Sequence, residues 1–137
     1  MEKACDYRTG MLNISSESTL EAVDFICLKV RKLLTENKLD DLIFEITLIS
    51  REVLVNAVKY GGKMRKDRSF RFLMRIDAEQ IIMAVIDQGN GFDWKRTFTK
   101  EIDLHSEGGR GLLIMNKYAT SLRYNRHGNR ALIKRNI

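Results

Sequence analysis

The sequence predicts a single α+β domain, built as a two-layer sandwich with helices on one face of a mixed, mainly antiparallel sheet. The chain has 137 residues, 44% of them hydrophobic, which suits one domain (residues 1–137) around one core. It contains no proline, and no linker-like tract divides it. Two helical patterns in succession precede neighbouring strand patterns, which favours helices on one face of a sheet over a doubly wound order.

The first half of the chain reads as one strand followed by two helices. Residues 7–14 predict the strand, and Ser18-Thr19-Leu20-Glu21 resembles the capping box of a helix N-terminus. The apolar residues of this first helix are Leu20, Val23, Cys27, Val30 and Leu34. A second helix is expected to begin near Asp40-Asp41 and to end at Gly61-Gly62, where left-handed geometry is free. Its apolar stripe holds Leu42, Ile46, Ile49, Val53 and Ala57.

The second half of the chain reads mainly as strands. Apolar residues alternate with arginines from Phe70 to Ile76, as in a strand with one covered face, whereas Ile81 to Ile86 is apolar on both faces. Residues 92–107 show no sustained period and read as a loop beside a site. A helix from residues 109–111 through Tyr118 and two strands joined at residues 127–129 complete the prediction.

Composition indicates the cellular location and excludes a membrane span, but it does not select one class of ligand. Two cysteines form no disulfide framework and the N-terminus lacks a secretory signal, so we expect a cytoplasmic protein. The longest apolar run, Ile81 to Ile86, is far short of the roughly 20 residues that cross a bilayer, so we expect no membrane span. The net charge of +6 suits a phosphate-bearing ligand, an acidic protein or nucleic acid alike.

The first candidate motif is a pair of polar residues on the second helix. Glu52 and Asn56 are four residues apart, so both side chains can reach a common ligand from one side of a helix. An isolated pair with this spacing is more often an ordinary solvated helix edge. The functional interpretation therefore needs support from other motifs.

The second motif, Asp87-Gln88-Gly89-Asn90-Gly91, directly follows a hydrophobic strand. This places a carboxylate at the end of the strand and two glycines where the backbone could lie against a flat ligand. An ionised Asp accepts hydrogen bonds, for instance from an exocyclic amine such as that of adenine. A simple turn is the alternative interpretation.

The third motif, Gly108-Gly109-Arg110-Gly111, precedes an apolar helix. Free backbone N–H groups and the positive end of the helix dipole would then face one point, which suits a phosphate chain. A glycine-rich hinge is the alternative, and Arg110 could equally be solvated or paired with phosphate.

Together the three motifs resemble the N, G1 and G2 boxes of the GHKL (Bergerat-fold) ATPases and kinases. The matching segments are residues 51–57 (REVLVNA), 87–92 (DQGNGF) and 108–112 (GGRGL). Within that superfamily, the run through residues 112–115 and the ending at residues 124–129 (YNRHGN) are similar to the serine/threonine kinase anti-sigma factors. The resemblance implies the Bergerat two-layer fold.

The resemblance also implies roles for the matching residues. Asn56 would give its side-chain oxygen to Mg²⁺, and Asp87 would bind the amino group of adenine. Glu52 would be the catalytic residue that orients or deprotonates the attacking hydroxyl. The other residues implied in ATP binding are Gly89, Gly91, Gly109, Arg110 and Gly111.

The function implied is that of an ATP- and Mg²⁺-dependent kinase. It would phosphorylate a STAS-type anti-anti-sigma protein on serine or threonine and hold a sigma factor inactive. Tyr60 stands where many relatives carry a histidine, which leaves the transfer rate open. The histidines, His105 and His127, fall in the expected loop and hairpin turn, so we do not expect a complete histidine kinase.

Two other functions and one assembly stay open. A non-catalytic ATP-binding module could sequester a partner without transferring phosphate. Nucleic-acid binding is less favoured than a solvated charged face, although 11 of the 24 basic residues lie in two stretches, the second of them near Tyr124. Those residues are Lys63, Arg65, Lys66, Arg68, Arg71, Arg75, Arg123, Arg126, Arg130, Lys134 and Arg135. The doubly apolar strand from Ile81 to Ile86 predicts a homodimer that covers the second face of the sheet.

Overall fold

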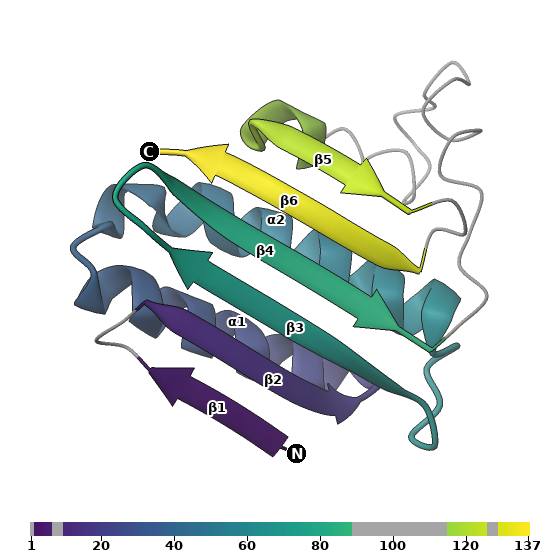
Figure 1. The fold of residues 1–137 in the computed structure, drawn as a ribbon. Coiled ribbons are helices and arrows are strands. Elements are labelled where there is room, and N and C mark those ends of the chain that lie inside the picture. The colour runs from purple at the N-terminus through teal and green to yellow at the C-terminus, as the bar shows by residue number, and fades with distance from the viewer. Residues whose placement is uncertain (1, 7–9, 89–114, 126–128) are drawn as a thin grey trace.

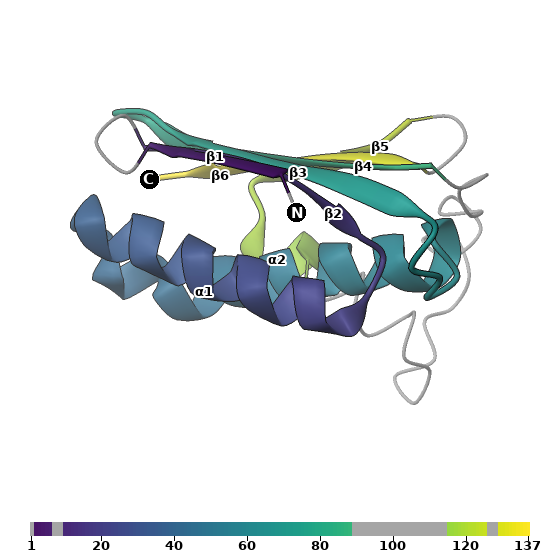
Figure 2. The same cartoon turned by 90° about the horizontal axis from the view of Figure 1, so that it is seen from below.

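The computed structural model describes residues 2–6, 10–88, 115–125 and 129–137. These residues form two layers, a six-stranded sheet in the order β1-β2-β3-β4-β6-β5 and a layer of helices on one face (Figures 1 and 2). The elements are β1 (Glu2–Asp6), β2 (Met11–Glu17), α1 (Leu20–Glu36), η1 (Asp40–Leu42), α2 (Ile43–Asn56), η2 (Ala57–Gly61), β3 (Ser69–Ile76), β4 (Gln80–Asp87), β5 (Ser121–Tyr124) and β6 (Arg130–Asn136).

Every strand pair in the described sheet is antiparallel, which confirms a mainly antiparallel sheet with helices on one face. The register sets one row of side chains across the helix-covered face, with Ile14 opposite Phe72, Phe72 opposite Val85, and Val85 opposite Ala131. All four are buried. The core therefore lies between this face and the helices, as alternation along the strands dictates.

Helix α1 buries a stripe that is close to the predicted one. Val23, Cys27, Val30 and Leu34 are in the core, but Leu20 is 42% exposed, so its assignment to the stripe was wrong. The helix is capped one residue later than expected, because the Thr19 hydroxyl accepts from the Ala22 backbone N–H at 3.2 Å. Leu20 is then the first helical residue, and there it faces solvent.

The second helix is less regular than its apolar stripe suggests. A 3₁₀ turn over Asp40–Leu42 precedes α2, and a π-helical turn, η2, follows it over Ala57–Gly61. The Gly62 N–H donates to the Ala57 carbonyl at 2.9 Å, the i to i−5 bond of a π turn. The predicted end at Gly61-Gly62 is confirmed, but the widened last turn was not foreseen. The expected left-handed geometry was wrong for both glycines, since Gly62 has a φ of −88° and the positive φ angles fall on Lys63 and Met64.

The strand predictions differ from the structure mainly at the N-terminus. The first strand was expected at residues 7–14, whereas β2 spans Met11–Glu17 and pairs with β1, which the sequence did not predict. Strands β3 to β6 lie where they were expected. A helical turn at residues 115–118 matches the predicted helix end. Residues 92–107 and 109–111, and the turn at 126–128, lie outside the described residues.

The second face of the sheet is not covered by any described element (Figure 2). Strand β4 is apolar on this face as well, since Ile82, Ala84 and Ile86 are partly buried there between their neighbours on β3 and β6. Among the residues that the structure describes, no helix is both long and apolar enough to cross a bilayer.

Candidate functional site

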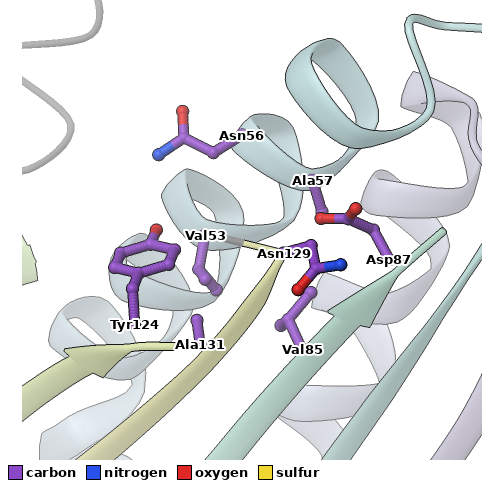
Figure 3. Close-up of a pocket in the computed structure, with 8 residues that line it drawn as sticks. All are labelled: Val53, Asn56, Ala57, Val85, Asp87, Tyr124, Asn129 and Ala131. Atoms are coloured by element: carbon purple, nitrogen blue, oxygen red, sulfur yellow. The ribbon is translucent and has the colours of Figure 1, made fainter. Parts of the chain in front are cut away.

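A small polar pocket lies where the end of β4 meets the end of α2 (Figure 3). Its walls come from segments far apart in the sequence, namely α2 with η2, β4, β5 and β6. The lining residues are Val53, Asn56, Ala57, Val85, Asp87, Tyr124, Asn129 and Ala131. The structure thus brings together Asn56 and Asp87, two residues that the sequence assigned to one site.

Asp87 is the last residue of β4 and is partly buried. Its backbone N–H donates to the Asn129 carbonyl at 3.0 Å, which carries the β4·β6 hydrogen bonding one step past the Ile86–Arg130 pair. The carboxylate points from the end of β4 towards η2 (Figure 3). A carboxylate in such a position is a fixed acceptor for a ligand amine.

The Asp87 carboxylate fits against a glycine of the π turn. A Cβ atom on Gly61 would lie 2.2 Å from Asp87 Cγ and 2.3 Å from Oδ1, distances that real atoms do not adopt. The missing side chain at this position is therefore what lets the carboxylate sit here. The widened turn has a function in the site, because it presents Gly61 to Asp87.

Asn56 ends α2 and is only 8% exposed, which is unusual for an amide. The Tyr124 hydroxyl points towards it from β5 (Figure 3). Burial raises the pKa of Tyr124 to about 12, hydrogen bonding to Asn56 offsets part of the rise, and the negative charge of Asp87 adds to it. The phenol is therefore protonated at neutral pH and supplies a fixed hydrogen-bonding group beside Asn56.

The hairpin between β5 and β6 is fixed by a pair of asparagines. The Asn125 side-chain oxygen accepts from the backbone N–H groups of Asn129 at 3.0 Å and Arg130 at 3.1 Å. The Asn125 amide also donates to the Asn129 side-chain oxygen at 2.7 Å. These bonds hold Asn129, which in turn accepts from the Asp87 backbone. A chain of hydrogen bonds thus connects the hairpin to the pocket.

Glu52 lies one helical turn before Asn56 on α2 and is partly buried, but it is not among the residues that line the pocket. Its neighbour Arg51 forms a salt bridge with Asp24 at 2.8 Å, which links α2 to α1. The predicted one-sided arrangement of Glu52 and Asn56 follows from their helical spacing. Asn56 and Asp87 both line the pocket, and Glu52 lies one helical turn before Asn56.

The remaining predicted ligand residues, Gly89, Gly91, Gly109, Arg110 and Gly111, lie outside the described residues. The structure adds two polar residues that the sequence did not assign to the site, Tyr124 and Asn129. Their signal was present but weak, since residues 124–129 were recognised only as a similar ending. Their part in the pocket depends on which strand lies beside β4, and β6 follows β4 in the sheet although it comes after β5 in the chain.

The described residues fit an adenine nucleotide in their chemistry. Asp87 is an acceptor for an exocyclic amine, and Gly61, Ala57 and Ala131 are small enough for a flat base to approach. The cavity between them measures about 10 Å³, room for one water molecule, so these residues form only part of the surface that a nucleotide would need.

Comparison with known proteins agrees with this geometry. A family model described as Histidine kinase-like ATPase domain matches residues 16–134, which cover all described elements from the end of β2 to β6. A search of curated proteins gives no match. The match spans most of the chain, which therefore belongs to the family of histidine kinase-like ATPase domains, and this membership implies that it binds ATP.

Proposed function

We propose that the protein is a cytoplasmic, ATP- and Mg²⁺-dependent serine/threonine kinase that acts as an anti-sigma factor. The observation that carries the proposal is the shared pocket of Asn56 and Asp87, with the carboxylate of Glu52 one helical turn away. These three groups supply an adenine acceptor, a metal-binding oxygen and a base. Phosphoryl transfer needs little more than positioning, charge neutralisation and one such carboxylate.

Asp87 would select the base. Its carboxylate only accepts hydrogen bonds, so it favours adenine, which presents an amino group, over guanine, which presents a carbonyl at the same place. The hydrogen bond from its backbone to Asn129 and the contact with Gly61 hold the carboxylate in one position. This rigidity supports selection, because an unsatisfied buried carboxylate penalises the wrong base.

Asn56 would hold the metal ion through its amide oxygen, since Mg²⁺ prefers oxygen ligands and takes others from phosphates and water. Mg²⁺ bound there would neutralise the phosphate charge that builds up during transfer. The Tyr124 hydroxyl lies beside Asn56 in the pocket (Figure 3) and would help to orient its amide. In this role Tyr124 is a positioning residue.

Glu52 would accept the proton of the attacking serine or threonine hydroxyl. The hydroxyl oxygen would bond to the γ-phosphorus of ATP while the bond from that phosphorus to the β,γ-bridging oxygen breaks, leaving ADP. The place of Glu52 on α2, outside the Asp87 pocket, is consistent with a residue that meets a protein substrate instead of the base. It flanks the end of the pocket where Asn56 would hold the phosphates.

The proposed partners are a STAS-type anti-anti-sigma protein as phosphoacceptor and a sigma factor as the sequestered client. Their support is the similarity of residues 112–115 and 124–129 to the serine/threonine kinase anti-sigma factors. The first and last of residues 124–129, Tyr124 and Asn129, line the pocket. A partner bound near it would sense whether the nucleotide is present.

A second function is favoured by one observation. Tyr60, in place of the histidine of many relatives, is 42% exposed on the π turn next to Gly61. If Tyr60 replaces a group needed for transfer, the chain is a binding module that uses ATP only to set its shape.

Two measurements test the proposal in order. Calorimetric titration with ATP and ADP, with and without Mg²⁺, should show Mg²⁺-dependent binding that Asn56→Ala weakens. Transfer of labelled γ-phosphate to a STAS-type acceptor should then occur with the wild type and not with Glu52→Gln. Binding without transfer, together with sequestration that survives Glu52→Gln, would select the non-catalytic module; absence of ATP binding by the folded protein would overturn both.

A further inference from the structure

The uncovered face of the sheet has a defined pattern of side chains. By register, Leu73 of β3 lies opposite Ala84 of β4, and Ala84 lies opposite Leu132 of β6. Ile82 and Ile86 continue this apolar band along β4. Leu132 is 39% exposed, and the others are partly buried by their neighbours on the sheet. The band is continuous across three strands.

Cations flank the apolar band on both sides. Arg71 and Arg130 lie opposite Ile86, and Arg75 and Lys134 lie opposite Ile82, in each case one on β3 and one on β6. Arg123 of β5 lies beyond Leu132. The acidic residues of this face lie towards one edge: Glu17 is at the end of β2, and by register Glu2 and Asp6 of β1 pair with Ser15 and Met11. The face is thus an apolar band between two rows of positive charge.

Nucleic acid fits this face poorly. Single strands are bound by basic residues together with aromatic rings on which bases stack. The aromatic residues of the described strands, Phe70, Phe72 and Tyr124, point to the helix side, where Phe70 and Phe72 are buried and Tyr124 lines the pocket. The sequence places basic and aromatic residues close together, but the strands put them on opposite faces.

A second copy of the chain also fits poorly. A face-to-face pair centred on the apolar band would bring two sets of the same five cations together, because the acids Glu2, Asp6 and Glu17 lie on β1 and β2 towards one edge. Like charges facing one another in a partly desolvated interface are unfavourable. The apolar band needs a partner, but the flanking charges call for one of the opposite sign.

We propose that this face binds an acidic amphipathic segment of another protein. Apolar side chains of the segment would cover the band from Leu73 to Leu132, and its carboxylates would pair with the arginines on either side. Arg71 is already oriented, since its Nε donates to the Asn13 side-chain oxygen at 3.0 Å across the face. The site lies on the opposite side of the sheet from the ATP pocket and does not depend on the proposed kinase activity.

Fluorescence anisotropy with a labelled copolymer of glutamate and tyrosine tests this proposal in the full chain. The test variant is Arg75→Glu/Lys134→Glu, and the matched control is Arg31→Glu/Lys66→Glu, which changes the net charge equally but lies off this face. We expect the test variant to bind the copolymer at least about tenfold more weakly than the wild type, and the control to change affinity by less than about twofold. Leu132→Asn should weaken binding without removing a charge.

Three outcomes would overturn the proposal. Equal weakening in both double variants would show that only net charge attracts the copolymer. Tighter binding of a 20-nucleotide oligodeoxythymidine that also depends on Arg75 and Lys134 would assign the face to nucleic acid. Sedimentation showing a wild-type dimer that Leu132→Asn separates would assign it to a second copy. ATP titration of the same variants distinguishes these results from failure of the nucleotide site, since ATP affinity should be unchanged.

Discussion

Gly61 lies directly against the carboxylate of Asp87, so that a Cβ atom at position 61 would be 2.2 Å from Asp87 Cγ. The contact joins the π turn after α2 to the end of β4. The position of the Asp87 carboxylate in the proposed ATP site therefore depends on a residue with no side chain. The same turn contains a second glycine, Gly62, whose added Cβ would instead strike Ser18 at 2.2 Å.

These two glycines provide a matched test. Gly61→Ala should displace the Asp87 carboxylate and weaken ATP binding by about ten- to a hundredfold, the effect of forcing a methyl group into a filled space. Gly62→Ala should lower the free energy of unfolding by about 1–3 kcal/mol through the clash with Ser18, with little change in ATP affinity. Calorimetry and urea unfolding measure the two effects. Equal loss of ATP affinity in both variants would contradict the role given to Gly61.

Asp87→Asn should remove nucleotide binding almost without changing the fold. The amide presents N–H groups where the adenine amino group also donates, so we expect at least about a hundredfold loss of ATP affinity. Gln88→Ala is a suitable control, because the Gln88 side chain is exposed and accepts from the Ser69 backbone N–H away from the pocket. If Asp87→Asn bound ATP as well as the wild type, another residue would select the base.

Tyr124 should make stability fall at high pH. Because burial raises the pKa of Tyr124 from 10.0 to about 12, the folded state holds this proton more tightly than the unfolded state. The protonated phenol therefore stabilises the folded state fully below pH 10, and this stabilisation is lost as the pH rises towards 12. It amounts to about 2–3 kcal/mol. Urea unfolding at pH 9 and pH 11 should show a smaller loss for Tyr124→Phe than for the wild type.

The asparagine pair of the β5–β6 hairpin should affect both stability and binding. Asn125→Ala removes three hydrogen bonds that hold Asn129 and Arg130, and should cost about 1–3 kcal/mol in unfolding free energy. ATP affinity should also fall, because Asn129 positions the backbone of Asp87. Asn13→Ala, which removes one exposed bond to Arg71, is the control and should leave both nearly unchanged. Unchanged ATP affinity in Asn125→Ala would show that the hydrogen bonds of Asn125 do not affect the position of Asp87.

The elements that sequence reasoning found are those with a strong period. The alternation from Phe70 to Ile76 and the stripe from Ile46 to Val53 each bury one side, so the pattern fixes the face. Leu20 was misassigned because a first-turn residue satisfies the spacing whether or not the core reaches it. The π turn had no recognisable signature, since Gly61 indicates the end of the helix but does not indicate whether the last turn is widened.

The sequence predicted part of the candidate site, namely the residues that belong to local motifs. Asp87 and Asn56 belong to local motifs, and the structure brings them into one pocket. Tyr124 and Asn129 join them only because β6 inserts between β4 and β5, a matter of long-range pairing. The local sequence of residues 124–129 was recognised as similar to the family's ending, but it did not indicate that Tyr124 and Asn129 line the pocket.

The strand order also determines when the pocket can form during synthesis of the chain. Asn129 and Ala131 leave the ribosome after every other wall of the pocket, and β4 has no neighbour on one edge until β6 arrives. A nascent chain that has emerged only as far as Tyr124 therefore exposes an apolar strand edge of the kind that recruits other chains. We expect such stalled chains to aggregate and to be retained poorly on immobilised ATP, so that nucleotide capture reports completion of the sheet.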